Sequence, residues 1–302
     1  MSTVSARTAP PADAPRRRVR ASAPDADPAP RPDAGHGARL VPAVERAVRL
    51  LDALAAARQP LSLASLARAL GLPRSSVHGL LATLVALGLA RRDGDAAFSL
   101  GPKSLQWADA YGSRSDVLRA FDACVDRFVE LGTETVMLAT LEDADVVYLG
   151  CRQGSRALAV NFRVGGRFPA ACTSSGKAML AALPDAAVRE RLGTGPLPRL
   201  TRHGPASAAA LLRQLDLVRR QGHAVDDEET AEGMQCFGAA IRGPRDTGAL
   251  AAVAVSVIKA GLSPRRRTEL VDAIRRLADA VAVELGAGPR PATGRAGPRG
   301  AG

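Results

Sequence analysis

The chain has 302 residues, of which 46% are hydrophobic and 3% aromatic, and its formal net charge at pH 7 is +11. This length accommodates a small domain and one further domain of ordinary size. No stretch approaches the ~20 apolar residues of a membrane helix and none resembles a secretory signal, so we expect a cytoplasmic protein without a membrane partner. The four cysteines lack paired spacing, which argues against a disulfide framework and a cysteine-based zinc site.

The positive charge is unevenly distributed. Residues 1–40 hold seven Arg and four Asp, residues 41–112 hold eight basic and five acidic residues, and residues 286–302 hold three Arg. Each of these segments therefore carries +3, which leaves +2 for the rest of the chain. The terminal segments 1–39 and 286–302 are rich in Pro, Ala, Gly and Arg and are predicted to be disordered tails, whose arginines are solvated charges on the simplest interpretation. The excess in residues 41–112 favours DNA as a partner.

The first predicted domain spans residues 40–101 and begins with a helix. Its apolar residues recur at helical spacing, with charged residues between them. The predicted stripe consists of Val44, Ala47, Val48, Leu51 and Leu54.

Two further amphipathic patterns meet in residues 61–84, which read LSLASLARALGLPRSSVHGLLATL. Ser62 is placed to cap the first helix, Gly71 to end it in a left-handed conformation, and Pro73 to start the second. This pattern predicts a helix-turn-helix. The residues expected to be buried are Leu63, Leu66, Ala67 and Leu70 in the first helix and Val77, Leu80, Leu81, Leu84 and Leu87 in the second.

The opposite face of the second helix carries short or basic side chains that donate hydrogen bonds to phosphates and base edges. The predicted DNA contacts there are Arg74, Ser75, Ser76, His78 and Thr83. Helical packing without any DNA role is the alternative for this motif.

A hairpin is predicted after the helices, because residues 89–92 and 97–100 are strand-like and Asp93-Gly94 is a favoured tight turn between them. Three helices followed by a hairpin make a winged helix. Arg91 and Arg92 at the base of the wing are placed to contact the sugar-phosphate backbone. An ordinary solvated strand end is the alternative for these two arginines.

A connecting helix is predicted within residues 102–115. Its aromatic residue, Trp107, is expected to pack either within the chain or against a partner subunit. The second predicted domain, residues 116–285, mixes the two periodicities in the order of an α+β domain with a central antiparallel sheet. Its predicted helices are 116–131, 173–182, 208–221 and one opening at Ser263-Pro264; its strands are 135–141, 146–152, 158–162, 236–241 and 249–258, with a loop at 165–169.

Strand 249–258 is nearly all apolar, so we expect it at the centre of the sheet with both faces covered. The segment Thr173-Ser174-Ser175-Gly176-Lys177 has the look of a phosphate loop. It lacks the first glycine of that motif, however, and Ala178 stands where a magnesium-binding hydroxyl belongs. We therefore expect neither a nucleotide nor any other cofactor.

Three sequence blocks follow the winged helix: GRFPAACTSSGKAML from Gly166, DDEETAEGMQC from Asp226 and AAVAVSVIKAGLSP from Ala251. Together they make residues 40–285 resemble the IclR family of bacterial transcriptional regulators. The resemblance implies a homodimeric or homotetrameric regulator, not an enzyme, that binds double-stranded DNA. It also implies that the C-terminal domain is GAF/PAS-like and binds a small-molecule effector. Gly79 departs from the family pattern, because a basic residue is common at this position of the recognition helix.

The resemblance further implies an effector site, with a ligand of the carboxylate or aromatic-acid type. The effector residues carried over are Gly165, Gly166, Asp226, Cys236 and Ser256. Cys236 is alternatively a plain buried residue, and Asp226 alternatively caps the turn that follows it. Ser256 lies in an apolar strand, so its hydroxyl needs some partner.

Two other functions are alternatives to this one. A metal-dependent hydrolase would have to use His203, His223, Asp226 and Cys236, but their spacing matches no metal motif, so no metal is expected. A DNA-binding protein without any ligand is the second alternative.

Overall fold

The computed structural model describes residues 40–94, 96–155, 162–244 and 249–287. The predicted tails lie outside the described residues, apart from residues 286 and 287. All of the predicted strand 158–162 except Phe162 also lies outside them. None of the helices within the described ranges has both the length and the hydropathy of a membrane span.

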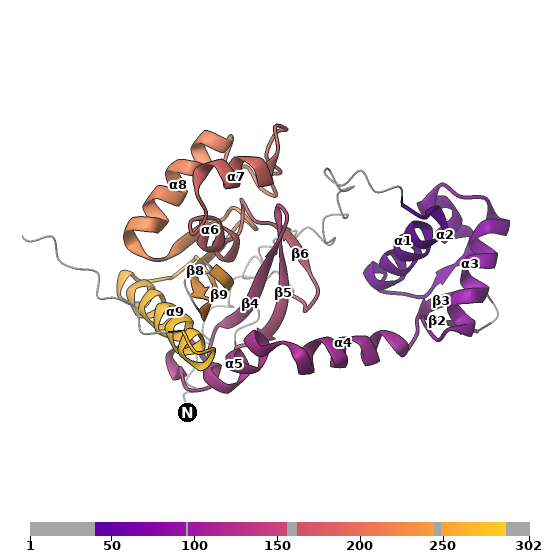
Figure 1. The fold of residues 1–302 in the computed structure, drawn as a ribbon, viewed down its shortest axis with the longest axis horizontal. Coiled ribbons are helices and arrows are strands. Elements are labelled where there is room, and N and C mark those ends of the chain that lie inside the picture. The colour runs from indigo at the N-terminus through magenta and orange to yellow at the C-terminus, as the bar shows by residue number, and fades with distance from the viewer. Residues whose placement is uncertain (1–39, 95, 156–161, 245–248, 288–302) are drawn as a thin grey trace, which may run out of the picture.

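The N-terminal domain is a three-helix unit with a small sheet (Figure 1). Its helices and strands are α1 (Pro42–Ala56), β1 (Leu61–Ser62), α2 (Leu63–Leu70), α3 (Arg74–Ala86), β2 (Ala90–Asp93) and β3 (Ala97–Leu100). The strand order is β1-β3-β2, with antiparallel pairing throughout. The winged helix-turn-helix is therefore confirmed, and the two-residue strand β1 adds a third strand to the predicted hairpin.

The corner between α2 and α3 forms as the sequence predicts. The Ser62 hydroxyl accepts a hydrogen bond from the amide of Ser65 at 3.2 Å, and Gly71 ends α2 with φ +65°. Pro73 is the residue immediately before α3. Leu66, Val77 and Leu81 are almost fully buried, so the corner is held by a shared apolar core as well as by its caps.

Two details of the predicted core are wrong. Val44 and Val48 are 61% and 50% exposed, because the face of α1 that packs on the domain runs through the unpredicted Leu50 together with Ala47, Leu51 and Leu54 of the predicted stripe. Leu87 lies just beyond the end of α3 and is 54% exposed.

Helix α4 (Lys103–Arg114) joins the two parts of the chain and has no buried residue (Figure 1). It ends where Ser115 caps α5 (Asp116–Val125). The C-terminal part is built on a six-stranded antiparallel sheet of order β6-β5-β4-β9-β8-β7. These strands are β4 (Thr135–Glu142), β5 (Asp145–Arg152), β6 (Arg167–Pro169), β7 (Ala224–Asp227), β8 (Met234–Arg242) and β9 (Ala249–Ile258).

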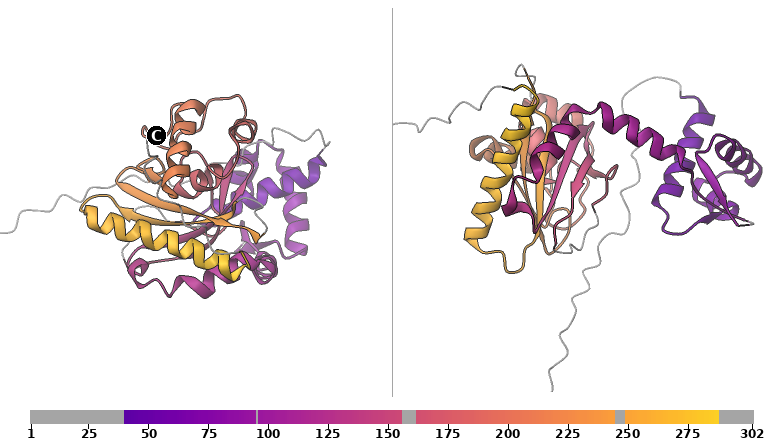
Figure 2. Two further views of the ribbon diagram at one scale, coloured as in Figure 1. Left: turned by 60° about the vertical axis from the view of Figure 1, so that its left-hand side comes forward. Right: turned by 90° about the horizontal axis from the view of Figure 1, so that it is seen from below.

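Helices cover both faces of this sheet (Figure 2). Helices α5 and α9 (Pro264–Glu284) pack on one face. Helices α6 (Ser174–Leu180), α7 (Asp185–Leu192) and α8 (Ala208–Gln221) lie over the other. Strand β9 is central and buried on both faces, as predicted. The α+β class and the antiparallel sheet are thus confirmed.

Several predicted boundaries need correction. The helix expected over 116–131 ends at Val125, because the chain turns back through a short 3-10 helix, η1 (Val129–Leu131), to enter β4. The predicted loop at 165–169 contains β6, an edge strand that ends on Pro169, where the missing amide costs no ladder bond. Strand β7 and helix α7 were not predicted.

Candidate functional site

The outer face of α3 is open to solvent. Arg74, Ser75, Ser76 and His78 are all exposed, while Val77 between them is fully buried. The Thr83 hydroxyl is exposed too and donates to the Gly79 carbonyl at 3.0 Å, which leaves its own oxygen free to accept. We call Arg74, Ser75, Ser76, His78 and Thr83 the recognition surface. All five predicted residues are exposed along α3 and spread over roughly half of its circumference.

The two arginines of the wing are exposed but have partners within the wing. Arg91 donates to the Ser99 hydroxyl at 2.9 Å and lies 3.2 Å from the Asp93 carboxylate. The Arg92 guanidinium lies over the Phe98 ring, 5.6 Å from its centroid. Both cations are therefore held against the strands, and Asp93 partly neutralises Arg91 before any phosphate arrives.

Three of the predicted effector residues lie side by side across neighbouring strands. Asp226 on β7 pairs in register with Cys236 on β8, and Cys236 pairs with Ser256 on β9. All three are almost fully buried on the face beneath α6. The Ser256 hydroxyl donates to the Cys236 sulfur at 3.1 Å, so its partner is inside the protein. We call Asp226, Cys236 and Ser256 the Asp226 row.

Asp226 also caps the turn that follows it. One carboxylate oxygen accepts the amide of Glu229 at 2.7 Å and the amide of Thr230 at 3.1 Å. Burial raises the pKa of this carboxyl, and the nearby Lys177 ammonium opposes the rise. The capping role foreseen as an alternative is therefore present, and it leaves the second carboxylate oxygen facing the row.

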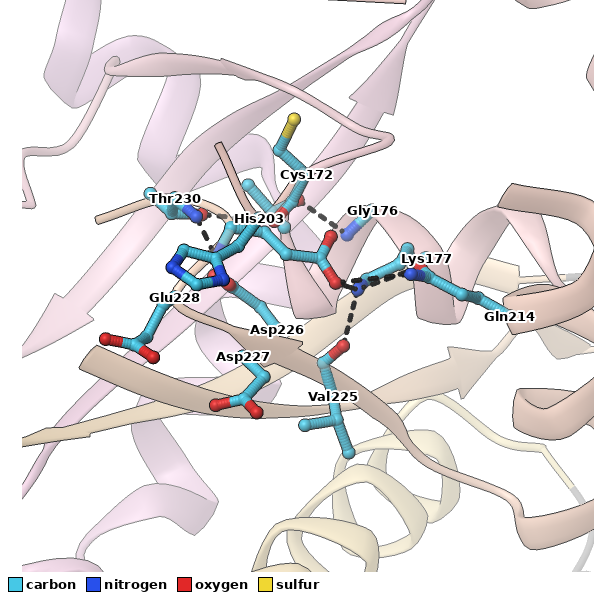
Figure 3. A network of polar contacts seen from close by, with 12 residues as sticks. Cys172, Gly176, Lys177, His203, Gln214, Val225, Asp226, Asp227, Glu228 and Thr230 are labelled. Carbon is cyan, nitrogen blue, oxygen red and sulfur yellow. Dashed lines mark hydrogen bonds and ion pairs between the residues drawn. The ribbon is translucent and has the colours of Figure 1, made fainter. Parts of the chain in front are cut away.

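A buried ion pair that the sequence analysis did not identify stands next to this turn (Figure 3). The Lys177 ammonium on α6 lies 2.7 Å from the Glu229 carboxylate, and only 1% and 6% of the two side chains are exposed. Lys177 also donates to the Gln214 side chain on α8 and to the Val225 carbonyl on β7. Burial raises the pKa of Glu229 to about 7, although Lys177 lowers it.

The predicted effector residues Gly165 and Gly166 are hydrogen-bonded to the backbone of Tyr148. The Gly165 amide donates to the Tyr148 carbonyl at 2.8 Å, and the Gly166 carbonyl accepts the Tyr148 amide at 3.0 Å. The Gly166 amide is used as well, since it donates to the Arg163 carbonyl. The backbone groups of this pair are therefore engaged within the protein, and Gly165 takes a φ of +84° that favours glycine.

Tyr148 links the glycines to the Asp226 row. Its buried phenol has a pKa well above the usual value because of burial and the nearby Cys236 and Asp226. Its ring also packs edge-on against Phe162 and at a tilt against Phe168, with ring centroids 5.5 Å apart in each pair. A polar aromatic residue in an apolar strand was the only sequence signal that could have pointed to it.

A cavity of about 260 Å³ lies elsewhere on the same face of the sheet and contains none of the predicted effector residues. Small side chains of α6 and β8, such as Ala178 and Ala240, line it together with His223 of the α8–β7 turn, one of the residues weighed above for a hydrolase. Between this cavity and the Asp226 row, α6 lies so close to Gly238 that a Cβ there would come within 2.6 Å of the Ser174 backbone. Across the described ranges, no group of His, Cys, Asp and Glu side chains is arranged to hold a metal ion.

Comparison with known proteins identifies both parts of the chain. Residues 43–94 match the IclR helix-turn-helix domain, and residues 109–283 match the bacterial transcriptional regulator IclR C-terminal domain. These two matches follow each other in the same order as the domains of the structure.

Individual relatives agree, although the chain aligns with slightly less than two thirds of the first of them. The chain is 34% identical to the Pca regulon regulatory protein of Pseudomonas putida over 63% of this chain and 65% of that protein. It is 32% identical to the probable transcriptional regulator SauR of Cupriavidus necator over 78% of this chain and 94% of that protein. An IclR homolog of Microbacterium hydrocarbonoxydans, solved with 4-hydroxybenzoate, has the same fold with a TM-score of 0.68 and 23% identity over 81% of this chain and 99% of that one. With both domains matched in order, this chain belongs to the IclR family of bacterial transcriptional regulators.

Proposed function

We propose that the N-terminal domain binds operator DNA through α3 and the wing, and that the C-terminal domain binds a small organic acid that alters this binding. The observation that carries the proposal is the recognition surface, a helix face of exposed hydrogen-bond donors on a helix whose other face is buried. No catalytic step is part of the proposal.

The recognition surface fits a major groove. Arg74, Ser75 and Ser76 occupy the first turn of α3, the end that a recognition helix presents to base edges. Gly79 leaves a gap in the middle of this face, so specificity rests on the residues that flank it. The wing arginines add contacts to the sugar-phosphate backbone, which supply affinity without sequence preference.

The Asp226 row and Tyr148 are the proposed effector site. Ligand sites are mostly apolar with a few converging polar groups, and here a carboxyl, a thiol and a hydroxyl lie in one row near Tyr148, whose ring packs against Phe162 and Phe168. This chemistry suits an aromatic acid. The 4-hydroxybenzoate bound by the Microbacterium homolog supports the same ligand class.

We also propose that the protein acts as a homodimer or homotetramer, with α4 and α1 at the subunit contact. Large apolar side chains are exposed on both helices, among them Leu105, Trp107 and Tyr111 on α4 and Val44 and Val48 on α1. An isolated 12-residue helix is marginal in water, so a helix with no buried side chain needs a partner surface. A second copy also supplies the second helix-turn-helix domain, which binds the other half-site of a palindromic operator.

The experiment is a titration of the protein on fluorescent DNA from the promoter beside its own gene, with and without 4-hydroxybenzoate. We expect Ser256→Ala to blunt the effect of the acid while DNA affinity without acid stays as in the wild type. Thr268→Ala, an exposed hydroxyl on α9, is the matched control and keeps the full response. Loss of DNA binding and acid response together in Ser256→Ala points to misfolding, which thermal unfolding detects; an undiminished response in a folded variant contradicts the proposed site.

A further inference from the structure

We propose that the effector site takes up one proton with each acid that it binds, and that Glu229 is the group that receives this proton. The inference rests on the proposed acid-binding function of the C-terminal domain. Glu229 would then determine whether the site accepts a negatively charged ligand, although Glu229 is not part of the Asp226 row.

The first step concerns Lys177, the cation nearest to the row. An ammonium has three hydrogens to donate, and Lys177 has three acceptors: the Glu229 carboxylate, the Gln214 side chain and the Val225 carbonyl. Its side chain is 1% exposed. Lys177 is therefore committed inside the protein and has no donor left for the carboxylate of a ligand (Figure 3).

The second step concerns the balance of charge. Lys177 faces two carboxyls, Glu229 directly and Asp226 at longer range, and the amide of Glu229 donates to the Asp226 carboxylate. With both carboxyls ionised, this buried group carries a net charge of −1. An acid placed against the Asp226 row brings a further negative charge, and like charges in a shared, poorly solvated site favour protonation of one of them.

The third step identifies the group that takes the proton. Two backbone amides donate to Asp226 and stabilise its charged form. Glu229, in contrast, has one carboxylate oxygen that is buried and has no hydrogen-bond partner within the described residues. A proton on that oxygen leaves the contact between Lys177 and the other oxygen intact. The pKa of Glu229, about 7 in the free protein, already lies next to neutral pH.

The titratable and polar side chains that act on Glu229 come from three elements and from the segment before α6. These are Lys177 on α6, Gln214 on α8, Asp226 on β7 and Cys172 in the segment before α6. Burial raises the pKa of Cys172 to about 11, so this thiol stays neutral near pH 7. The Thr201 hydroxyl faces the backbone carbonyl of Glu229 and does not titrate. Glu229 is thus the member of this group placed to change charge near neutrality.

The test is calorimetric titration with 4-hydroxybenzoate at pH 8 in two buffers of different ionisation enthalpy, which gives the number of protons taken up. We expect a value approaching one in the wild type, and an affinity that falls about tenfold for each pH unit above neutrality. In Glu229→Gln the uptake should vanish and the affinity should lose this pH dependence. Glu228→Gln is the matched control, because Glu228 lies on the same turn and pairs with Lys259 on the outside.

The results separate the inference from the function on which it rests. Binding without proton uptake in the wild type, or uptake that persists in Glu229→Gln, overturns the inference alone. A titration in which the wild type does not bind the acid contradicts the proposed acid-binding function and removes the inference with it. A second readout needs no ligand: the infrared band of a protonated carboxyl at pH 6 should be present in the wild type and absent in Glu229→Gln, and its absence in the wild type also overturns the inference.

Discussion

We expect sequence-specific contact to depend most on Arg74, because it is the long basic side chain of the recognition surface. Arginine binds guanine edges or phosphates through a planar fork of donors that the shorter serines beside it cannot replace. Its exposed position at the first turn of α3 keeps this fork free to enter a groove.

We predict that Arg74→Ala weakens binding to the cognate operator by about 1 to 3 kcal/mol, with a smaller effect on unrelated DNA. Fluorescence anisotropy on both DNAs at one salt concentration measures the two effects. Arg119→Ala serves as the control, since Arg119 is an exposed arginine on α5 paired with Asp116. Equal losses for the two variants would mean that α3 does not face the DNA.

A second prediction concerns the free energy of unfolding and its dependence on pH through Glu229. Its pKa is raised from 4.5 to about 7 in the folded protein, so the folded state binds more protons than the unfolded state between these values. Stability from this group is therefore largest at low pH and is lost as pH rises through the window. Glu229→Gln should remove a fall of about 1 to 3 kcal/mol between pH 5 and pH 8.

Urea unfolding of the wild type and Glu229→Gln at pH 5 and pH 8 gives the four free energies needed. The difference between wild type and variant is the informative quantity, because groups distant from Glu229 titrate alike in both proteins. A difference that is the same at both pH values contradicts the raised pKa.

At the scale of elements, the two arginine side chains of the wing are held in place by neighbouring residues. Arg91 is held by Asp93 and Ser99, and Arg92 lies on Phe98, so neither side chain has to be ordered from a fully mobile state when DNA binds. Partial neutralisation by Asp93 opposes this gain. The net effect of the wing on affinity is set by the competition between Asp93 and the phosphates.

We predict that Arg91→Ala with Arg92→Ala lowers DNA affinity to a similar degree on all sequences and reduces the slope of log affinity against log salt by up to about 2. Asp93→Asn should act in the opposite direction, with tighter binding at low salt. Titrations at three salt concentrations provide both slopes. An unchanged slope in the double variant would place the wing away from the backbone.

How much of the fold could be predicted differs from element to element. The α2–α3 corner was predictable because its caps and its apolar stripes agree. Strand β1 was not, because two residues are too short to show a period, and β7 was not, because two of its four residues are aspartates, which are depleted in strands. Helix α7 buries only Val188 and thus has no stripe to detect, and the Pro and Gly around β6 conceal an edge strand.

The candidate site, too, was predictable from the sequence in some residues and not in others. The exposed donors of α3 follow from helical periodicity alone, and the structure places them as expected. The contact between Lys177 and Glu229 joins residues 52 positions apart, so no local pattern reveals it. The resemblance named Asp226, Cys236 and Ser256 separately, and only the strand register shows that they form one row.

On the scale of the whole molecule, assembly depends on the helices that bury least. We predict that Leu105→Lys with Tyr111→Lys shifts the protein toward monomers and weakens operator binding, because a charged α4 cannot pack against a second copy. Sedimentation velocity measures the first effect and anisotropy the second. Val129→Lys is the control, since Val129 is 84% exposed but lies in η1, outside α4. Identical sedimentation of both variants and the wild type would exclude α4 from the subunit contact.

Helix α4 is long enough to amplify a small rotation. Its 12 residues span about 18 Å at about 1.5 Å per residue, and none of them is buried. Turning an arm of ~18 Å by about 10° at its C-terminal end moves its far end by about 3 Å, close to the ~3.4 Å rise of one base pair. A rearrangement around α5 too small to disturb the sheet would therefore shift α3 by one step along an operator, which is enough to break its register with the bases.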